Sequence, residues 1–344
     1  MVMKVYDNIT LKSYNTFGID VKAKRLIVVE GVGDLPLLKE RTVGRVLFLG
    51  AGSDIVFTRD FDGTVVCQQG GRVHYEKTES GTRVVAPAGL MLDDLVRRTL
   101  DRGLYGLENL SAIPGTVGAA AVQNVGAYGV EAKDFISNVT LFHLDTGHLT
   151  TLDNKACKFG YRTSCFKGGD GFQMIVSVTF LLPDTPAYEP NLSYKALADE
   201  VGRRCGKRRP SVHEVRRIIT DLRWSKLPRP EENGSAGSFF KNPVVTAEVY
   251  ERLKTKYSDM PEGHPSFSGH SSSPMYKLSA GWLIDRAGWK GRTMGRAGVW
   301  HNNALVLYNA GGCSGDEVCA LATAIQQDVK RKFNVVLEPE AIII

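Results

Sequence analysis

The stretch AIPGTVGAAAVQNVGAYG, residues 112–129, contains no charged side chain and consists mainly of glycine, alanine and valine. A close-packed loop in the core is one interpretation of this sequence. The other is a wall along which the backbone lies against a flat ring and its phosphates without steric or charge conflict. Because a loop with a purely structural role seldom stays so small and uncharged for so long, we favour contact with a ligand.

A second glycine-containing segment lies earlier in the chain. LGAGSD, residues 49–54, ends an apolar run, and the backbone amides beside its glycines could surround a phosphate. The third glycine of a dinucleotide fingerprint is missing and the next residues favour an extended chain. A pyrophosphate would therefore rest on a nest of amides and not on a helix end. A tight turn without a ligand is the alternative.

Two further segments place a functional group beside aromatic residues. FGYRTSCFK, residues 159–167, sets Arg162 next to Tyr161, so the guanidinium either rests on a ring at the surface or faces a substrate carboxylate. SAGSFFKNP, residues 235–243, sets Ser238 between a glycine and two phenylalanines, which is typical of a turn serine or of a proton donor. It lacks the G-x-S-x-G form, and no histidine has an indicative spacing, so a hydrolase triad is not expected.

The C-terminal segment LEPE, residues 337–340, precedes four apolar residues and indicates the start of a strand. Its glutamates are solvated charges in one interpretation. If one of them faces a pocket instead, its carboxyl needs a raised pKa or an arginine partner to lie near a second carboxylate.

Composition limits the class of protein. With 344 residues the chain is long enough for two or three domains, and 43% apolar and 23% charged residues exclude a disordered, collagenous or coiled-coil chain. The net charge of +6 suits an anionic partner. The basic run at 203–209 lacks interleaved aromatic residues, so we interpret it as a solvated segment and do not expect nucleic-acid binding.

Cysteine usage and the N-terminus indicate the compartment. The six cysteines include no C-x-x-C pair and no histidine at zinc spacing, so reduced thiols and no metal site are expected. The first residues form no apolar signal segment, and no run approaches the length of a spanning helix. The cytoplasm is the expected compartment.

Hydrophobic periodicity predicts an α/β unit followed by a strand-rich domain. The expected elements of the first are strands at 25–30 and 45–49, a helix at 35–39 and an extended segment at 55–57. Those of the second are strands at 64–68, 83–86, 138–144 and 173–182 and an amphipathic helix at 92–102.

Capping residues mark the later helices. Ser211, Thr246 and Ser314 predict helices that run to about residues 223, 256 and 332, and residues 258–274 are expected to form a loop. The expected domains are 1–66, 67–226 and 227–337, with the segment 338–344 returning to the first domain as a strand.

Taken in order, these segments resemble the UDP-N-acetylenolpyruvoylglucosamine reductase family, in its longer form, nearly end to end. The matching motifs are NTFG (15–18), LGAGS (49–53), IPGTVG (113–118), QNVGAYG (123–129), GYR (160–162), GSFFKNP (237–243), AGWLID (280–285) and EPE (338–340). Each motif is weak alone, but several in one order are jointly specific.

The resemblance implies a multidomain α+β and α/β fold, with two N-terminal FAD-binding domains of the vanillyl-alcohol-oxidase type and a third, α+β, substrate-binding domain. It also implies FAD as cofactor, NADPH as reductant and no metal. The implied role is a cytoplasmic, monomeric flavoprotein oxidoreductase of peptidoglycan precursor synthesis, which serves cell-wall biogenesis, cell shape and cell division. Its implied partners are small molecules, with neither nucleic acid nor membrane among them.

The family's site residues match positions of this chain one by one. The catalytic residues match Arg162, Ser238 and Glu340. The FAD-binding residues match Gly50, Ala51, Gly52, Ser53, Asp54, Pro114, Gly115, Thr116, Gly118, Asn124, Gly126, Ala127 and Tyr128. The substrate-binding residues match Tyr161, Tyr194, Lys226, Asn242 and Asn303, and Tyr194 matches the tyrosine that covers the substrate in the longer form.

The chemistry that the resemblance implies is reduction of the enolpyruvyl group of UDP-N-acetylglucosamine enolpyruvate to the lactyl ether of UDP-N-acetylmuramate. Hydride comes from N5 of reduced FAD, Arg162 and Glu340 stabilise charge at the carboxylate, and Ser238 gives the proton. An FAD-dependent oxidase or dehydrogenase of the same fold, acting on an alcohol or hydroxy acid, is the alternative enzyme. The Ser238 and Glu340 segments count against it. A basic module that binds a nucleotide sugar or a nucleic acid is the alternative without catalysis.

Overall fold

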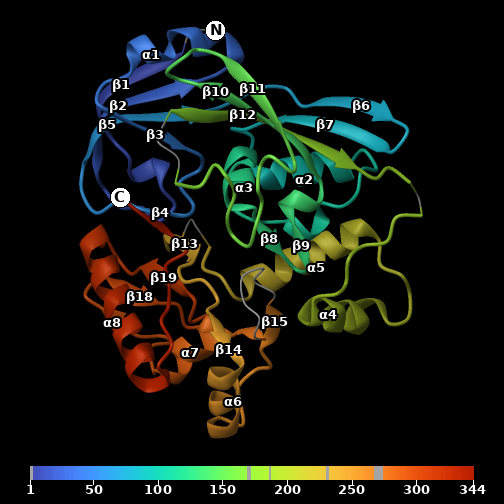
Figure 1. The fold of residues 1–344 in the computed structure, drawn as a ribbon, viewed down its shortest axis with the longest axis vertical. Helices are drawn as coiled ribbons and strands as arrows, with labels where there is room; N and C mark the ends of the chain where they lie inside the picture. Colours follow the sequence, from blue (N-terminus) through green and yellow to red (C-terminus); the bar gives the residue numbers. More distant parts are fainter. Residues whose placement is uncertain (1–2, 169–171, 186, 230–231, 267–273) are drawn as a thin grey trace. The chain divides into compact units, whose positions relative to one another are not determined.

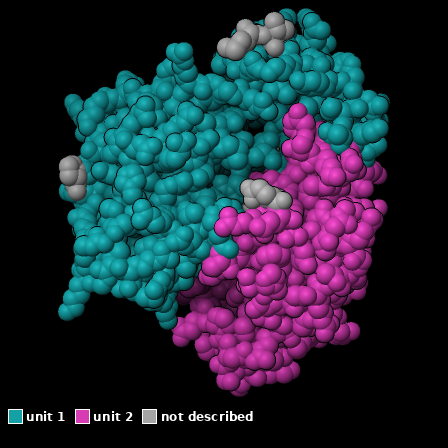
Figure 2. Space-filling model, turned by 180° about the vertical axis from the view of Figure 1, so that it is seen from behind, with its two compact units in different colours: residues 1–10, 22–52, 60–224 teal, residues 11–21, 53–59, 225–344 magenta. Residues whose placement is uncertain are grey.

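The computed structural model describes residues 3–168, 172–185, 187–229, 232–266 and 274–344. The chain divides into two compact units, coloured separately in Figure 2. Unit 1 consists of residues 1–10, 22–52 and 60–224, and unit 2 of residues 11–21, 53–59 and 225–344. The finer division into domains 1–66, 67–226 and 227–337 stays a prediction.

Unit 1 begins with a four-stranded sheet of order β1-β2-β5-β3, drawn in blue in Figure 1. Its strands are β1 (Lys4–Thr10), β2 (Lys22–Val29), β3 (Arg45–Leu49) and β5 (Phe61–Gln68). β2 and β3 both run parallel to β5, and the connection between them passes through the 3-10 helix η2 (Val32–Leu37) and the short helix α1 (Leu38–Arg41). The single helix expected at 35–39 is wrong in form, because Pro36 has no N–H to donate to a continuous α-helix.

The second sheet of unit 1 is antiparallel throughout and has the order β11-β10-β12-β7-β6. Its strands are β6 (His74–Thr78), β7 (Gly81–Pro87), β10 (Ile136–His143), β11 (Leu149–Asp153) and β12 (Gln173–Leu182). Helix α2 (Leu92–Leu100) buries the apolar residues that its periodicity predicted, and they share one core with this sheet and with helix α3 (Val117–Gln123). The shorter elements here are η3 (Glu108–Leu110), β8 (Gly126–Ala127), β9 (Val130–Glu131) and η4 (Ala132–Asp134).

Two helices, α4 (Lys195–Cys205) and α5 (Val212–Trp224), complete unit 1 and bury a small cluster that includes Leu197, Val215 and Ile219. The predicted cap of α5 is confirmed, since Ser211 Oγ accepts from Glu214 N at 3.2 Å and Glu214 Oε2 accepts from Ser211 N at 2.9 Å. The basic run at 203–209 is mostly exposed, and several of its arginines are paired with carboxylates: Arg203 and Arg204 bind Glu200 of α4, and Arg208 binds Glu214 of α5.

Unit 2 contains two small antiparallel sheets. The first has the order β13-β19-β18-β17 and the second the order β14-β16-β15. The strands are β13 (Ser235–Ser238), β14 (Val244–Thr246), β15 (His264–Ser266), β16 (Met275–Lys277), β17 (Thr293–Met294), β18 (Ala297–Val299) and β19 (Val306–Asn309). The loop expected over 258–274 is wrong at β15, which gains its order from pairing with β16. Residues 267–273 lie outside the described part of the chain.

The helices of unit 2 are η1 (Lys12–Tyr14), α6 (Ala247–Lys256), α7 (Ala280–Arg286) and α8 (Gly315–Phe333). The predicted caps of α6 and α8 are confirmed, because Thr246 and Ser314 accept from the backbone N–H three residues on. The C-terminal strand is shorter than expected: β20 (Ile342–Ile343) pairs in parallel with β4 (Ile55–Val56). Thr58 adds two hydrogen bonds to the carbonyl of Ile344, at 2.6 and 2.8 Å.

Among the described residues, no helix combines the length and the apolar character needed to cross a membrane. The described His, Cys, Asp and Glu side chains form no group of three or more that could hold a metal ion. The six cysteines are free thiols.

Candidate active site

The two segments expected to hold FAD lie side by side in unit 1. A Cβ on Gly50 would come within 2.7 Å of Thr116 Oγ1 and 3.2 Å of Ala119 Cβ, so only glycine permits this approach. Gly52, two residues on, adopts the left-handed conformation with φ 62°. The turn after β3 therefore lies directly against the uncharged stretch at Thr116 and Ala119. The turn's last two predicted residues, Ser53 and Asp54, belong to unit 2.

The uncharged stretch is not a plain loop, because it contains helix α3. Thr116 caps this helix and accepts from Ala119 N at 3.3 Å. The N–H groups of Val117 and Gly118 donate to the carbonyls of Leu90 and Ala88, at 2.8 and 2.9 Å. Since the protein itself uses these amides, they are not available to a phosphate. This favours the turn at 50–54 as the phosphate-binding element.

Asn124 ends α3 in the left-handed conformation with φ 42° and is fully buried. Its side-chain amide donates to Glu131 Oε2 at 3.1 Å and to the carbonyl of Gly160 at 2.8 Å, and it accepts from Lys133 N at 3.0 Å. These bonds join α3 to the segment that carries Arg162. A direct contact between this amide and FAD stays a prediction.

Tyr128 and Tyr194 bring a predicted cofactor residue and a predicted substrate residue together. Their rings meet edge to face, with centroids 5.3 Å apart, and Tyr194 is 46% exposed. Burial raises the pKa of Tyr128, so its hydroxyl stays protonated near neutral pH. Asn109 fixes the backbone here by donating to the carbonyl of Tyr128 at 2.7 Å.

Arg162 occupies a tight turn of unit 1. Gly160 N donates to the carbonyl of Thr163 at 3.0 Å, and Arg162 itself has a left-handed φ of 54°. Its Nη2 donates to the carbonyl of Gly126 at 2.7 Å, and its guanidinium lies 5.3 Å from the centre of the Tyr161 ring. The cation thus lies near the Tyr161 ring and is also bonded to the predicted FAD segment, and its contact with a substrate carboxylate stays a prediction.

Further side chains, which the sequence reasoning missed, tie the Arg162 loop to the C-terminal end of α3. Ser164 Oγ donates to the carbonyl of Val122 at 2.7 Å, and Lys167 Nζ donates to Gln123 Oε1 at 2.5 Å. Together with the bonds of Asn124 and Arg162 they form the Arg162 strap, a set of four side-chain hydrogen bonds. The signal in the sequence was the presence of these polar residues inside two quoted motifs.

Ser238 and Glu340 are brought together in unit 2 by backbone pairing. Glu340 N donates to the carbonyl of Phe239 at 2.8 Å, and Lys241 N donates to the carbonyl of Glu338 at 2.9 Å. Ser238 ends strand β13 at a register irregularity opposite Val306, so it lies at a strand end and not in a plain turn. The next two rings, Phe239 and Phe240, are buried and anchor the pairing.

Two of the remaining predicted substrate residues of unit 2 each accept a hydrogen bond from the backbone through the side-chain oxygen. Asn242 Oδ1 accepts from Ala280 N at 3.0 Å, and Asn303 Oδ1 accepts from Leu305 N at 3.1 Å. This orientation leaves the amide N–H groups of both residues as donors for a ligand. Lys226 is exposed. The convergence of Arg162, which lies in unit 1, with Ser238 and Glu340 stays a prediction.

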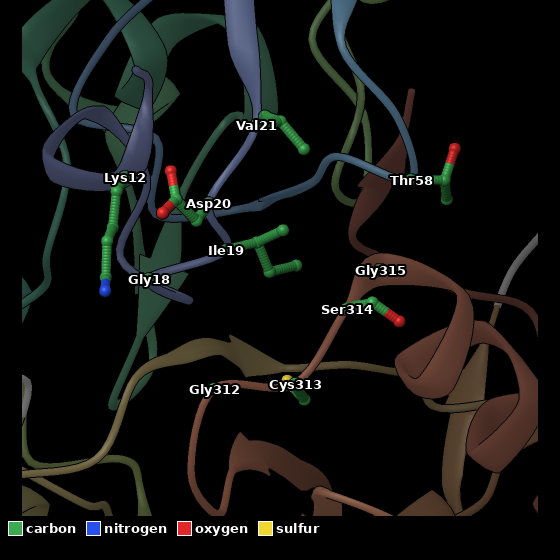
Figure 3. Close-up of a pocket in the computed structure, with 10 residues that line it drawn as sticks. All are labelled: Lys12, Gly18, Ile19, Asp20, Val21, Thr58, Gly312, Cys313, Ser314 and Gly315. Carbon is green, nitrogen blue, oxygen red and sulfur yellow. The ribbon is translucent and has the colours of Figure 1, made fainter.

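Unit 2 also contains a cavity of about 240 Å³ that none of the predicted site residues lines. Figure 3 shows the backbone at 18–21 on one side and the loop at 312–315 on the other. Burial raises the pKa of the Cys313 thiol to about 11, so this wall carries no thiolate near neutral pH.

Two family models match the chain. The model "FAD binding domain" matches residues 39–153, and the model "UDP-N-acetylenolpyruvoylglucosamine reductase, C-terminal domain" matches residues 229–344. The first range includes the Gly50 and Thr116 segments, and the second includes Ser238 and Glu340.

Known proteins agree with these matches. UDP-N-acetylenolpyruvoylglucosamine reductase of Pseudomonas aeruginosa is 43% identical over 346 residues, covering 99% of both chains. The enzyme of that name from Paraburkholderia phymatum is 45% identical over 340 residues, covering 96% of this chain and 95% of its own.

Solved structures confirm the predicted fold class. The crystal structure of UDP-N-acetylenolpyruvylglucosamine reductase from Thermus caldophilus is similar with a TM-score of 0.68 at 23% identity, over 99% of each chain. That of 6-hydroxy-D-nicotine oxidase from Arthrobacter nicotinovorans has a TM-score of 0.50 at 12% identity, over 97% of this chain and 86% of its own. With the sequence identities above, the chain belongs to the UDP-N-acetylenolpyruvoylglucosamine reductase family.

Proposed function

We propose that this chain uses NADPH and FAD to reduce the enolpyruvyl group of UDP-N-acetylglucosamine enolpyruvate to the lactyl ether of UDP-N-acetylmuramate. Family membership supports the reaction. The observation that supports the assignment to particular residues is the backbone pairing of residues 239–241 with 338–340, because the predicted proton donor Ser238 directly precedes one of these segments and the predicted Glu340 belongs to the other.

The residues of unit 1 fit FAD in size and charge. The Gly50 turn approaches Thr116 so closely that no side chain intervenes, and the adjoining stretch 112–129 carries no charge that would oppose a diphosphate. Of the predicted residues 50–54, those at 50–52 belong to unit 1 and would hold the diphosphate together with Ser53 and Asp54, which follow them in the chain. Residues 114–118 and 126–128 would lie along the ring system. FAD, when bound and reduced by NADPH, supplies the hydride.

Arg162 would hold the substrate carboxylate and stabilise the negative charge that spreads into it. A guanidinium is always charged and presents a fork that matches a carboxylate. The Arg162 strap fixes the loop before substrate arrives, so little reorganisation is needed when the charge develops. Glu340 would lie at the same end of the substrate, where Arg162 offsets its charge.

Ser238 would deliver the proton to the carbon that bears the ether oxygen. One hydride at the terminal carbon and one proton at this carbon together convert the enolpyruvyl group to the lactyl ether, so the reaction balances. The backbone pairing beside Phe239 supports this role, because general-acid transfer requires a donor on a well-positioned part of the backbone.

Four predicted residues would bind the substrate around this centre. The Tyr194 ring packs edge to face against Tyr128, is partly exposed to solvent, and would cover the substrate. Lys226 would bind the diphosphate of the substrate. Asn242 and Asn303 would donate from their amides. Tyr161, the fifth predicted substrate residue, would bind the substrate beside Arg162, whose guanidinium lies 5.3 Å from the centre of its ring. We also propose that the enzyme acts as a monomer in the cytoplasm, with small molecules as its partners, in the synthesis that supports the cell wall, cell shape and division.

An anaerobic titration of the purified protein tests this proposal. We expect a yellow protein that NADPH bleaches and that regains its colour when UDP-N-acetylglucosamine enolpyruvate is added, with one UDP-N-acetylmuramate formed per NADPH. A colourless protein that does not oxidise NADPH would indicate a binding module instead. Bleaching by an alcohol or hydroxy acid would indicate an oxidase or dehydrogenase.

A further inference from the structure

Ala112 stands immediately before the segment 113–118 and has a left-handed φ of 57°. A residue with a Cβ populates the left-handed conformation roughly tenfold less than the right-handed one. The left-handed geometry turns the chain from η3 into the predicted FAD segment. Something in the surrounding structure must therefore hold Ala112 in place.

Two charged side chains bind the two peptide groups of Ala112. Asp93, on α2, accepts from Ala112 N with Oδ1 at 2.6 Å. Arg223, near the end of α5, donates from Nε to the carbonyl of Ala112 at 3.1 Å. Two helices that are distant in the sequence, α2 and α5, thus bind the amide and the carbonyl of Ala112.

A third charged residue, Arg216, holds the Asp93 carboxylate in place. Arg216, also on α5, donates to Asp93 through both arms of its guanidinium, at 2.6 and 2.8 Å. Burial alone would raise the pKa of Asp93, but the bonds from Arg216 and Ala112 outweigh it and the pKa is lowered. Burial lowers the pKa of Arg223, and the nearby Asp93 and Tyr128 oppose that effect.

The Asp93 side chain is 37% exposed and that of Arg216 20%, so this ion pair by itself adds little to the stability of the two helices. The geometry points to a positioning role: we propose that Asp93, held by Arg216 and assisted by Arg223, keeps Ala112 in its left-handed conformation and so places residues 113–118 for FAD. We call these three side chains the Ala112 clamp. The inference rests on the proposed binding of FAD by residues 114–118.

The rate at which FAD leaves the purified holoenzyme tests the clamp, measured as the gain of flavin fluorescence after dilution. Asp93→Ala should release FAD roughly tenfold faster, because Ala112 loses the bond that offsets its strain. Adding Ala112→Gly should return the rate to within about twofold of the wild type, since glycine adopts this conformation without strain. Ala112→Gly alone should change the rate little.

Asp221→Ala is the matched control. Asp221 is on α5 and accepts from Arg204 at 2.6 Å, but it does not touch Ala112, so its loss should leave FAD release unchanged. If Asp93→Ala does not fold, Ala112→Val serves in its place, because a β-branched residue opposes the left-handed conformation while the ion pair is intact.

The outcomes separate the two proposals. Yellow wild-type protein with unchanged release from Asp93→Ala, or from Ala112→Val where that variant is used, overturns the clamp alone. Faster release that Ala112→Gly does not restore also overturns it, because Asp93 would then support the fold in general. Wild-type protein that is purified without FAD and does not take it up overturns the proposed function and the clamp together.

Discussion

The two regions that carry the proposed catalytic residues are joined to the neighbouring segments mainly by different kinds of bond. Side chains hold the Arg162 loop: Arg162, Ser164, Lys167 and Asn124 all donate to or accept from the end of α3 or its neighbours. Backbone groups hold Ser238 and Glu340, through the pairing of residues 239–241 with 338–340. Side-chain bonds can be removed one at a time by substitution, whereas backbone pairing survives most substitutions. The Arg162 loop should therefore be the more sensitive of the two to changes outside the reacting groups.

The largest loss of activity is expected from a substitution of Ser238, the proposed proton donor in the region held by backbone pairing. Ser238→Ala should lower kcat by about 10² to 10⁴ because the proton donor is lost. FAD should remain bound and NADPH should still be consumed slowly on mixing, since neither depends on this hydroxyl. Stopped-flow absorbance separates the two half-reactions. Normal steady-state turnover would remove the proposed role of Ser238.

A smaller loss of activity is expected when one side-chain hydrogen bond of the Arg162 loop is removed. Ser164→Ala removes the bond to the carbonyl of Val122 and also the acceptor of Phe166 N, so kcat should fall roughly three- to tenfold. Ser164→Thr keeps the hydroxyl and should retain most of the activity. Equal kcat values for both variants would show that the Arg162 strap does not limit catalysis.

The smallest loss of activity is expected from Gln326→Ala, the substitution near Glu340 that corresponds to Ser164→Ala near Arg162. Gln326 Nε2 donates to the carbonyl of Leu337 at 2.8 Å, so it supports the Glu340 segment as Ser164 supports the Arg162 loop. Gln326→Ala should lower the free energy of unfolding by about 1 kcal/mol but change kcat less than about twofold, because the backbone pairing persists. A loss of kcat as large as that of Ser164→Ala would break the comparison.

The start of α8, the helix that leads into the Glu340 segment, provides a test by pH. A hydrogen bond from Arg296 and bonds from the Ser314 and Arg296 amides lower the pKa of Glu317 to about 2, from an ordinary value of 4.5. The stabilisation is therefore complete above about pH 4.5 and is lost as the pH falls toward 2. Glu317→Gln should reduce the acid dependence of thermal unfolding in that window. The change should be small because the site is exposed to solvent.

Elements stabilised by local interactions were predicted well. The helices after Ser211, Thr246 and Ser314 begin where their caps indicated, and α2 buries the predicted apolar residues. Strands β3 and β12 have the predicted bounds. Strand β1, which pairs with β2, was missed, because its residues are mostly exposed and show no clear alternation.

The candidate site shows the same limit. Its motifs could be predicted from the sequence, since each is a short run of unusual composition. The Arg162 strap and the Ala112 clamp could not, because Ser164, Asp93 and Arg216 look like ordinary polar residues until the fold brings their partners near.

The sequence by itself determined the family, the capped helices and the identity of the candidate catalytic residues, because motifs and caps are read within a few neighbouring residues. Only the tertiary structure decided that Gly50 lies against Thr116, that Glu340 pairs beside Ser238 and that two helices grip Ala112. These contacts join segments far apart in the chain. Their partners are selected by the packing of the whole sheet and helix assembly, and no local preference encodes that choice.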